Sequence, residues 1–259
     1  MIKIVFMDVD GTLLSEKDRS LSPSTEESIL NLVRRGIQVV LVTGRPYNLC
    51  GELRKLGMDT IISANGALIK SGDEVIHKSV LSARMVREFS EFAELNRSSI
   101  SYFTESFAMN GLCTTDVRVT DALRDTLGLM EYPLTISSLE QEVYCICLYA
   151  DQTEAEKFLY QFPTLKFVRF HPYVSNVMEE NNVSKSIAAE KVLAHLNISR
   201  EEAMAFGDGE NDIDLLEYVG LGIAMGNGGE RIKQSADYVT LRASEDGITH
   251  ALKKFEIIE

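Results

Sequence analysis

The sequence lacks any apolar run long enough to cross a membrane. Nowhere do about eighteen apolar residues follow one another without interruption. The first eleven residues are apolar, but Asp8 and Asp10 interrupt them, so we expect no secretory signal there. Internal repeats, low-complexity segments, Gly/Ser linkers and blocks of like charge are also missing. These absences indicate an ordinary globular protein.

Cysteine and histidine are both scarce, with four of each in 259 residues. Cys145 and Cys147 lie two apart, on one side of a predicted strand, which is the spacing of neither a zinc knuckle nor a redox pair. The histidines are scattered without metal-ligand spacing. Buried or incidental thiols in a reducing compartment fit this pattern, so we expect a cytoplasmic protein.

Basic residues are outnumbered by acidic ones, 26 against 39, which gives a formal net charge of −13. Such a charge repels nucleic acid and anionic lipid, and no local basic patch offsets it. We therefore predict neither a nucleic-acid partner nor a membrane partner. The apolar fraction of 45% and the charged fraction of 25% are those of a chain that buries a substantial core.

Short apolar runs of strand type alternate with helical patterns at both ends of the chain. Ser24 and Glu27 have the spacing of a capping box, and Pro46 is well placed to begin a second helix. A further helix is predicted at 185–196. The predicted strands are 2–7, 37–42, 60–63, 203–206, 221–225 and 238–241. This alternation predicts an α/β fold with a doubly wound, mostly parallel, Rossmann-like sheet.

The segment 82–181 separates the two halves of that sheet and is far too long for a loop. Its patterns predict helices near 85–92 and at 152–161, and strands at 100–103, 143–149, 165–170 and 174–178. We therefore predict an α+β cap domain at 82–181, inserted into a catalytic core domain formed by residues 1–81 and 182–259.

Two carboxylates, Asp8 and Asp10, stand directly after the first predicted strand. Ligands of doubly wound sheets bind beyond the carboxyl ends of strands. A buried strand rarely ends in two carboxylates unless they are paired or bind a cation. The strand period of two puts both on similar sides, and Gly11 permits a sharp turn. An isolated Asp-x-Asp is more often a turn or a cap, so the interpretation depends on three later segments.

Each of those segments places polar groups at the end of a predicted strand or helix. Thr43 and Gly44 offer a hydroxyl and closely approaching backbone N–H groups to an anion. Lys185 opens a helix, where an ammonium group suits a phosphate. Segment 207–212 carries three acidic residues beyond a strand, which fits a hard cation. Taken singly, each could be a turn, an exposed helix start or a solvated loop.

Together these segments resemble the four motifs of the haloacid dehalogenase superfamily of aspartate-nucleophile phosphatases. The matching residues are Asp8-x-Asp10-Gly11-Thr12, Thr43, Lys185 and Gly207-Asp208-x-x-Asn211-Asp212, in that order. The insertion is similar to the large α+β cap of the Cof-type branch. Segments 63–67 and 224–227 also look like that branch. Asn182 and Ser186 depart from it, because glycine is common there, and so does Val177, where an acidic residue is common.

The resemblance implies hydrolysis of a phosphate monoester of a small metabolite through an aspartyl-phosphate intermediate. It assigns Asp8 as the nucleophile and Asp10 as general acid and base, which requires surroundings that favour a neutral Asp10. It also implies Mg²⁺, held by the Asp8 carboxylate, the Asp10 backbone carbonyl and the Asp208 carboxylate.

The same resemblance implies how the phosphoryl group is held. Lys185, the Thr43 hydroxyl and backbone N–H groups near Gly44 would neutralise its oxygens. Asn211 would contact the phosphate or its surroundings, and Asp212 would support the metal or Lys185. Arg45 is a candidate either for substrate binding or for a salt bridge to the cap, and Asn65 fits a turn before Gly66. In the cap, the sequence offers candidates for recognition of the leaving group without ranking them: Tyr102, Phe103, Glu105, His171 and Tyr173.

Sugar phosphates are the first substrates that the resemblance suggests, with a flavin or pyridoxal phosphate also open. A sugar phosphomutase of the phosphomannomutase kind is one alternative, and a non-catalytic metal-dependent ligand-binding or regulatory protein is another. Asp10 argues against a dehalogenase, because a departing halide needs no proton. We expect a monomer or a weak homo-oligomer.

Overall fold

The computed structural model describes residues 1–133, 135, 141–179 and 181–259. They form two compact units. The first unit comprises residues 1–43, 51–77 and 184–259, and the second comprises 44–50 and 78–183. The limits 81/82 and 181/182 remain our proposal for the domain boundaries.

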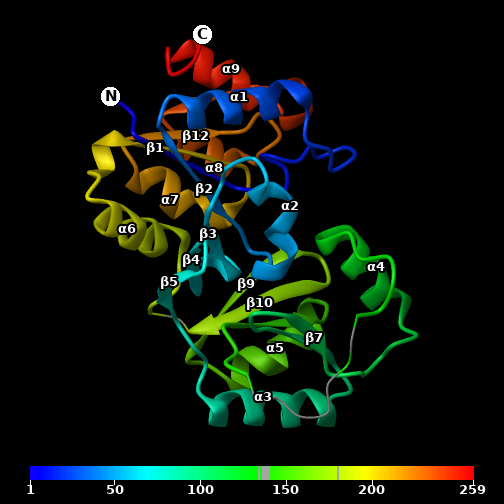
Figure 1. Ribbon diagram of the computed structural model, residues 1–259. Helices are drawn as coiled ribbons and strands as arrows, with labels where there is room; N and C mark the ends of the chain where they lie inside the picture. Colours follow the sequence, from blue (N-terminus) through cyan, green and yellow to red (C-terminus); the bar gives the residue numbers. More distant parts are fainter. Residues whose placement is uncertain (134, 136–140, 180) are drawn as a thin grey trace. The chain divides into compact units, whose positions relative to one another are not determined.

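The first unit contains an eight-stranded sheet, in the order β13-β12-β11-β1-β2-β3-β4-β5 (Figure 1). Every described pairing from β13 to β3 is parallel, and β4 pairs with β3 antiparallel. The strands are β1 Ile4–Met7, β2 Gln38–Val42, β3 Thr60–Ser63, β4 Leu68–Ser71, β5 Glu74–Lys78, β11 Ala203–Gly207, β12 Leu221–Ala224 and β13 Tyr238–Val239. The predicted α/β class with a mostly parallel sheet is confirmed.

The sequence patterns missed part of this unit. Strands β4 and β5 and helix α8 were not predicted, and the single helix expected after Pro46 is two short pieces, η1 and α2. The helices of the first unit are α1 Pro23–Arg34, α2 Gly51–Arg54, α6 Lys185–Leu196, α7 Ile213–Tyr218, α8 Glu230–Ser235 and α9 Gly247–Lys254. The 3₁₀ turns are η1 Tyr47–Cys50, assigned to the second unit, and η2 Ala64–Gly66, η3 Arg200–Glu202, η4 Glu210–Asp212 and η5 Ala243–Glu245.

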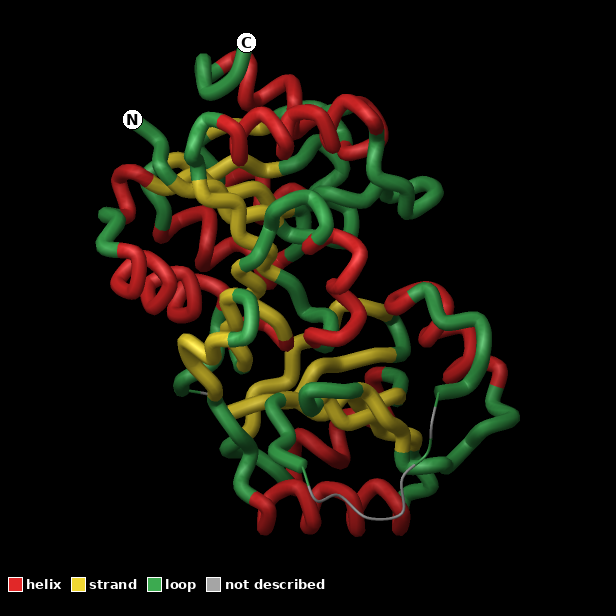
Figure 2. The backbone as a smooth tube through the Cα atoms, viewed as in Figure 1, coloured by secondary structure: helices red, strands yellow, loops and turns green. Residues whose placement is uncertain are grey.

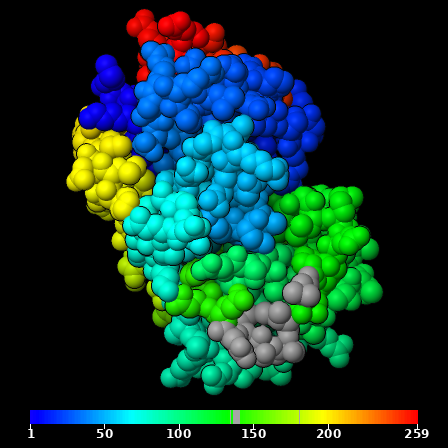
Figure 3. Space-filling model, viewed as in Figure 1, coloured from blue at the N-terminus to red at the C-terminus, as the bar shows by residue number. Residues whose placement is uncertain are grey.

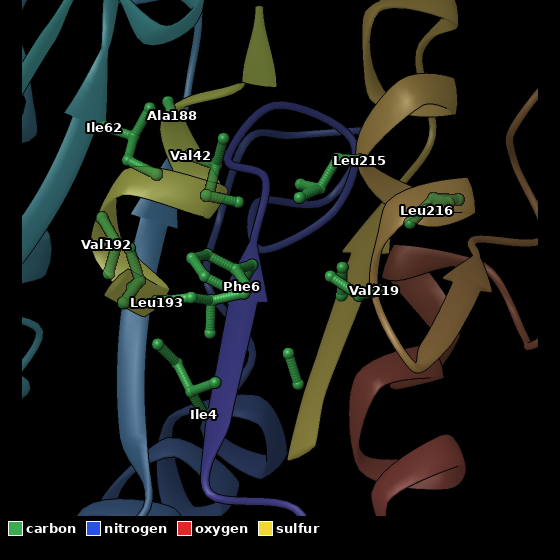
Figure 4. Packing of buried hydrophobic residues seen from close by; sticks show 14 of the residues in the cluster. Ile4, Phe6, Val42, Ile62, Ala188, Val192, Leu193, Leu215, Leu216 and Val219 are labelled. Atoms are coloured by element: carbon green, nitrogen blue, oxygen red, sulfur yellow. The ribbon is translucent and has the colours of Figure 1, made fainter. Parts of the chain in front are cut away.

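An apolar layer joins the sheet of the first unit to α6 and α7 (Figure 4). Ile4 and Phe6 of β1 are fully buried in it, and α6 contributes Val192 and Leu193 from one face. All four residues of β1 are buried, which is why its sequence is continuously apolar and does not alternate. This layer fixes the carboxyl ends of the central strands, from which the candidate site is built.

The first and last helices of the chain lie side by side. Helix α1 contacts α9, and the amino-terminal and carboxyl-terminal segments adjoin in the space-filling view (Figure 1, Figure 3). Ser24 and Ser28 both contact the Thr249 hydroxyl, at 3.1 and 2.8 Å. These contacts tie the two ends of the chain to one edge of the same unit.

The capping box predicted at Ser24 and Glu27 is wrong. Helix α1 begins two residues earlier, with Ser22 as N-cap, and the Ser22 hydroxyl accepts from the Thr25 backbone N–H at 3.1 Å. Pro23 determines this start, because its fixed φ and missing N–H suit the first helical position. Ser24 therefore lies inside the helix.

We predict that Ser22→Ala lowers the free energy of unfolding by about 1 kcal/mol, because an N-cap acceptor is lost. Ser22 also donates to Asp246 at 2.5 Å, so the loss should not be smaller than for a simple cap. Ser24→Ala is the matched control and should change stability less, because the preference of alanine for the helix interior offsets part of the loss of the Thr249 contact. Urea unfolding of both variants checks this, and equal losses would contradict the assignment.

The second unit contains a five-stranded sheet, in the order β7-β6-β8-β10-β9, whose described pairings are all antiparallel. Its strands are yellow and its helices red in Figure 2. Its strands are β6 Ser99–Phe103, β7 Phe107–Met109, β8 Cys145–Tyr149, β9 Leu165–His171 and β10 Val174–Glu179. Its helices are α3 Ala83–Leu95, α4 Val117–Leu127 and α5 Gln152–Gln161. The predicted α+β character is confirmed, although β7 and α4 were not predicted.

The core of the second unit is rich in phenylalanine. Phe89 of α3 packs against Phe158 and Phe162, with ring centroids 5.2 and 4.8 Å apart. Val177 of β10 lies fully buried in the same cluster, which explains why an apolar residue stands where the Cof-type branch commonly has an acid.

The cysteines and the helices agree with two expectations from the sequence. All four cysteines are free thiols, and Cys145 and Cys147 are buried on β8. Among the helices of the described residues, none combines the length and the apolar character needed to cross a membrane.

Candidate active site

Three adjacent strands of the first unit deliver the main polar residues of the candidate site. Strand β1 lies between β11 and β2, and all three are parallel, so their carboxyl ends meet at one edge of the sheet. Asp8 follows β1, Thr43 follows β2 and Asp208 follows β11. These three residues therefore follow strands, as the sequence predicted.

A buried lysine joins two of the segments. The Lys185 ammonium group contacts Asp8 Oδ1 at 2.7 Å and Asp212 Oδ1 at 2.5 Å, and the side chain is 1% exposed. Burial alone lowers the pKa of Lys185, but the charges of Asp212 and Asp8 outweigh it, so the pKa is raised. The lysine is thus a fixed positive charge, 177 positions along the chain from Asp8.

Three carboxylates lie close together beside Lys185. One oxygen from each of Asp8, Asp208 and Asp212 lies within 4.8 Å of the other two. Burial raises the pKa of Asp208 to about 7, and the neighbouring Asp212 charge adds to the effect. Burial also raises the pKa of Asp8, against the lowering effect of Lys185. The cluster holds more negative charge than Lys185 offsets, which favours a cation beside it.

The donor set fits Mg²⁺, which prefers carboxylate and carbonyl oxygens. Both oxygens of Asp212 are already used, because Oδ1 accepts from Lys185 and Oδ2 accepts from the backbone N–H groups of Asp208 and Gly209, at 3.2 and 3.0 Å. Asp212 therefore supports the lysine and the loop. The Asp208 carboxylate accepts from the neutral side chains of Thr12 and Asn227, and Lys185 contacts Oδ1 of Asp8, so these two carboxylates could still contact a divalent cation.

Contacts from distant segments hold the Asp208 carboxylate in place. Thr12 Oγ1 donates to Asp208 Oδ1 at 2.9 Å, and Asn227 Nδ2 donates to Asp208 Oδ2 at 3.2 Å and to the Gly11 carbonyl at 2.8 Å. No role for Thr12 or Asn227 was predicted. The signal for Asn227 was present in segment 224–227, which resembles the Cof-type branch.

Asp10 is partly exposed and pairs with an arginine. Its side chain is 43% exposed, and the Arg19 guanidinium contacts Asp10 Oδ1 at 3.0 Å. The neutral form expected for Asp10 remains a prediction. Arg19 lies in a loop and has a φ of 59°. Nothing in the sequence indicates this conformation.

Thr43 and Asn211 are linked through Asn65. The Thr43 carbonyl accepts from the Asn65 backbone N–H at 3.0 Å, and Asn65 Oδ1 accepts from Asn211 Nδ2 at 2.9 Å. Gly44 belongs to the second unit, where its carbonyl accepts from Asn176 Nδ2 at 3.4 Å. Asn211 and Thr43 therefore lie at one site with Asn65, a residue that the sequence left unassigned.

Ser186, which stands where glycine is common in the branch, has specific partners. Its backbone N–H and its hydroxyl both donate to Asp214 Oδ2, at 3.0 and 2.6 Å. The N-cap Ser184 accepts from the Ile187 backbone N–H at 3.2 Å. These contacts fix the first turn of α6, and so the position of Lys185. Asn182, the other departure from glycine, lies exposed.

The unranked cap candidates lie in the second unit, and two of them have packing roles. Tyr102 is buried, with its hydroxyl 2.8 Å from that of Ser90, and Phe103 is buried against Phe107. Tyr173 lies under the Arg118 guanidinium, 4.6 Å from its ring centroid, and its backbone N–H donates to His171 Nδ1. Arg45 is assigned to the second unit. Glu105 is exposed.

Asp8 and Asp208 follow central strands of a mostly parallel α/β sheet, and a buried lysine at the start of α6 pairs with Asp8. This combination of fold and site is that of the haloacid dehalogenase class. The chain belongs to the haloacid dehalogenase-like hydrolase family, whose model matches residues 5–252. It is a phosphatase of that superfamily.

Three known proteins show how far the similarity extends. The putative phosphatase YkrA of Bacillus subtilis is 30% identical over 99% of both chains. The 5-amino-6-(5-phospho-D-ribitylamino)uracil phosphatase YitU of the same organism is 28% identical over 97% of both. The solved structure of BT4131, a HAD subclass IIB sugar phosphatase, is 30% identical and superposes with a TM-score of 0.85, covering 99% of this chain and all of that one.

Gly11 offers a test of the Asp208 position. Its φ is +82°, and a Cβ there would lie 2.3 Å from Asp208 Oδ2. We predict that Gly11→Ala displaces the Asp208 carboxylate. The Mg²⁺ concentration at the midpoint of thermal stabilisation should then rise at least about tenfold, because a charged ligand is lost. Thermal unfolding during a Mg²⁺ titration measures this.

Gly36→Ala is the matched control for that substitution. Gly36 also has a positive φ, +75°, but a Cβ there would meet nothing within 4 Å. This variant should show the same kind of backbone strain and an unchanged Mg²⁺ midpoint. An equal weakening in both variants would mean that strain, and not the position of Asp208, controls the effect.

Proposed function

We propose that this chain is a Mg²⁺-dependent phosphatase that hydrolyses phosphate monoesters of small metabolites, foremost sugar phosphates, through an aspartyl-phosphate intermediate. The observation that carries the proposal is the buried Asp8–Lys185–Asp212 arrangement, with Asp208 alongside. A fixed ammonium group beside a strand-end carboxylate suits attack on a phosphoryl group that carries negative charge.

Asp8 is the proposed nucleophile. Its carboxylate attacks phosphorus, the ester oxygen leaves, and the phosphoryl group becomes attached to Asp8. Asp10 protonates the leaving alkoxide and afterwards takes a proton from the attacking water, which releases phosphate and restores Asp8. In this scheme Asp10 leaves its contact with Arg19 during turnover and contacts the oxygen to which it transfers the proton.

Electrostatics explains why the nucleophile needs positive neighbours. A carboxylate and a phosphate dianion ~4 Å apart at an effective dielectric of ~20 repel each other by about 8 kcal/mol. Lys185, at 2.7 Å from Asp8, offsets part of this repulsion. The Thr43 hydroxyl and backbone N–H groups after β2 bind the remaining phosphoryl oxygens. Asp8, Asp208 and the Asp10 carbonyl would hold a Mg²⁺, which would supply further positive charge and help to orient the phosphoryl group.

Sugar phosphates are the proposed substrate class because the relatives favour them. BT4131 is a sugar phosphatase, and the substrate named for YitU carries its phosphate on a ribityl chain. A phosphomutase remains the second candidate, since its site chemistry is the same. Release of inorganic phosphate, compared with the formation of an isomeric sugar phosphate, separates the two reactions.

We predict that Asp8→Asn lowers the rate of phosphate release from a panel of sugar phosphates at least about a thousandfold, because the amide is not a nucleophile. The same change at the exposed Asp59 should leave the rate unchanged. Circular dichroism checks that both variants are folded. Retained turnover in Asp8→Asn would remove Asp8 from the mechanism. A folded parent protein that releases no phosphate would favour the non-catalytic alternative.

We also predict that chelation abolishes turnover and that added Mg²⁺ restores it, because the acidic cluster and the phosphate both carry negative charge. The protein should remain folded in the chelator, since its core does not depend on the ion, and thermal unfolding checks this. Activity that is indifferent to the chelator would exclude the metal from the mechanism.

A further inference from the structure

The turn η2 has an unusual backbone. Ala64, Asn65 and Gly66 have φ values of 49°, 55° and 107°, so three successive residues lie in the left-handed region. Glycine adopts that region freely and asparagine tolerates it, whereas alanine does so at some cost. Strain of this kind persists where the surrounding structure requires a particular arrangement.

The turn touches three segments that carry site residues. The Asn65 backbone N–H donates to the Thr43 carbonyl at 3.0 Å, and its Oδ1 accepts from Asn211 Nδ2 at 2.9 Å. A Cβ on Gly66 would lie 2.4 Å from the carbonyl oxygen of Ser184, the residue before Lys185. Asn65 therefore lies where the ends of β2, η4 and the start of α6 come together, all within the first unit.

One group of this turn has no hydrogen-bond partner among the described residues. Asn65 is 4% exposed, and its Nδ2 is buried without a hydrogen bond to any part of the chain that the structure describes. A buried donor that stays unpaired costs roughly 1–3 kcal/mol, so such a group needs an explanation. Its oxygen is engaged by Asn211, which leaves the amide N–H₂ as a donor for which the described residues supply no acceptor.

We propose that Asn65 binds the substrate directly, by donating from Nδ2 to a non-bridging oxygen of the phosphoryl group. The inference rests on the proposed function, in which that group lies beside Asp8, Lys185 and Thr43. Lys185 supplies a positive charge there, and an anionic oxygen is the acceptor that such a site takes up. Asn65 thereby completes the set of phosphate-binding groups while holding Asn211 through its own oxygen.

The test uses inorganic phosphate as the probe, with Mg²⁺ present, and follows the thermal stabilisation of the full chain. Asn65→Gly removes the amide and keeps the positive φ without strain. A hydrogen bond to a charged group contributes enough that its loss weakens binding about tenfold or more. We therefore expect the phosphate midpoint of Asn65→Gly to rise at least about tenfold. A rise below about twofold would overturn the proposal.

Asn197→Gly is the matched control. Asn197 is also an asparagine with positive φ, 53°, in the first unit, and it caps the end of α6 opposite to Lys185. It should lose a similar amount of stability and keep the phosphate midpoint of the parent protein. An equal rise in both variants would show that backbone loosening causes the effect and would overturn the proposal.

A double-mutant cycle separates direct binding from the positioning of Asn211. If Asn65 acts only by holding Asn211, the effect of Asn65→Gly disappears in an Asn211→Ala background. If it binds phosphate itself, a weakening of about tenfold persists there, which is the result that we expect. Loss of the effect in that background would overturn direct binding.

The phosphate titration measures binding, and the phosphate-release assay measures turnover, so the two results are independent. A parent protein that binds phosphate, loses this binding in Asn65→Gly and yet hydrolyses no monoester would support the role of Asn65 while refuting the proposed hydrolase. A parent protein that hydrolyses monoesters, with a phosphate midpoint unaffected by Asn65→Gly, would support the proposed hydrolase and refute the role of Asn65. Absence of saturable phosphate binding by the parent would overturn the inference.

Discussion

The buried ammonium group of Lys185 determines the arrangement of the site. It is 1% exposed and lies between Asp8 and Asp212, so the end of β1, the start of α6 and the loop after β11 must approach one another to satisfy its charge. An unpaired charge at this depth would cost several kcal/mol, far more than a loop rearrangement. The apolar layer between the sheet and α6 brings these segments close, and the ion pairs then fix their geometry.

The same arrangement leaves an imbalance of charge that suits phosphoryl transfer. Asp212 uses both oxygens to hold Lys185 and the backbone of its own loop, while Asp208 is held by neutral donors from Thr12 and Asn227. Neutral donors position a carboxylate without cancelling its charge, so Asp208 keeps its capacity for a cation. Stability and chemistry are thereby divided between two aspartates only four positions apart.

Much of the fold and of the site could be predicted because its signals are local. A strand buried on both faces is continuously apolar, as β1 is, and a carboxylate at its end stands out against that run. Contacts across the chain have no such signal. Thr12 and Asp208 are 196 positions apart, and Asn227 and Gly11 are 216 apart, so only folding brings them together. The N-cap at Ser22 was not predicted because Ser22 and Ser24 are both possible caps. Pro23, which suits the first helical position, favours Ser22.

The departures from the Cof-type pattern show what the site tolerates. Glycine is common where Ser186 stands, yet Ser186 bonds twice to Asp214, and Ser184 caps the same helix. The first turn of α6 is therefore held by side chains of its own and does not depend on glycine. Because Lys185 is fixed both by this turn and by two carboxylates, its position can survive changes around it. Gly11 has no such freedom, since the space for its Cβ is occupied by the Asp208 carboxylate itself.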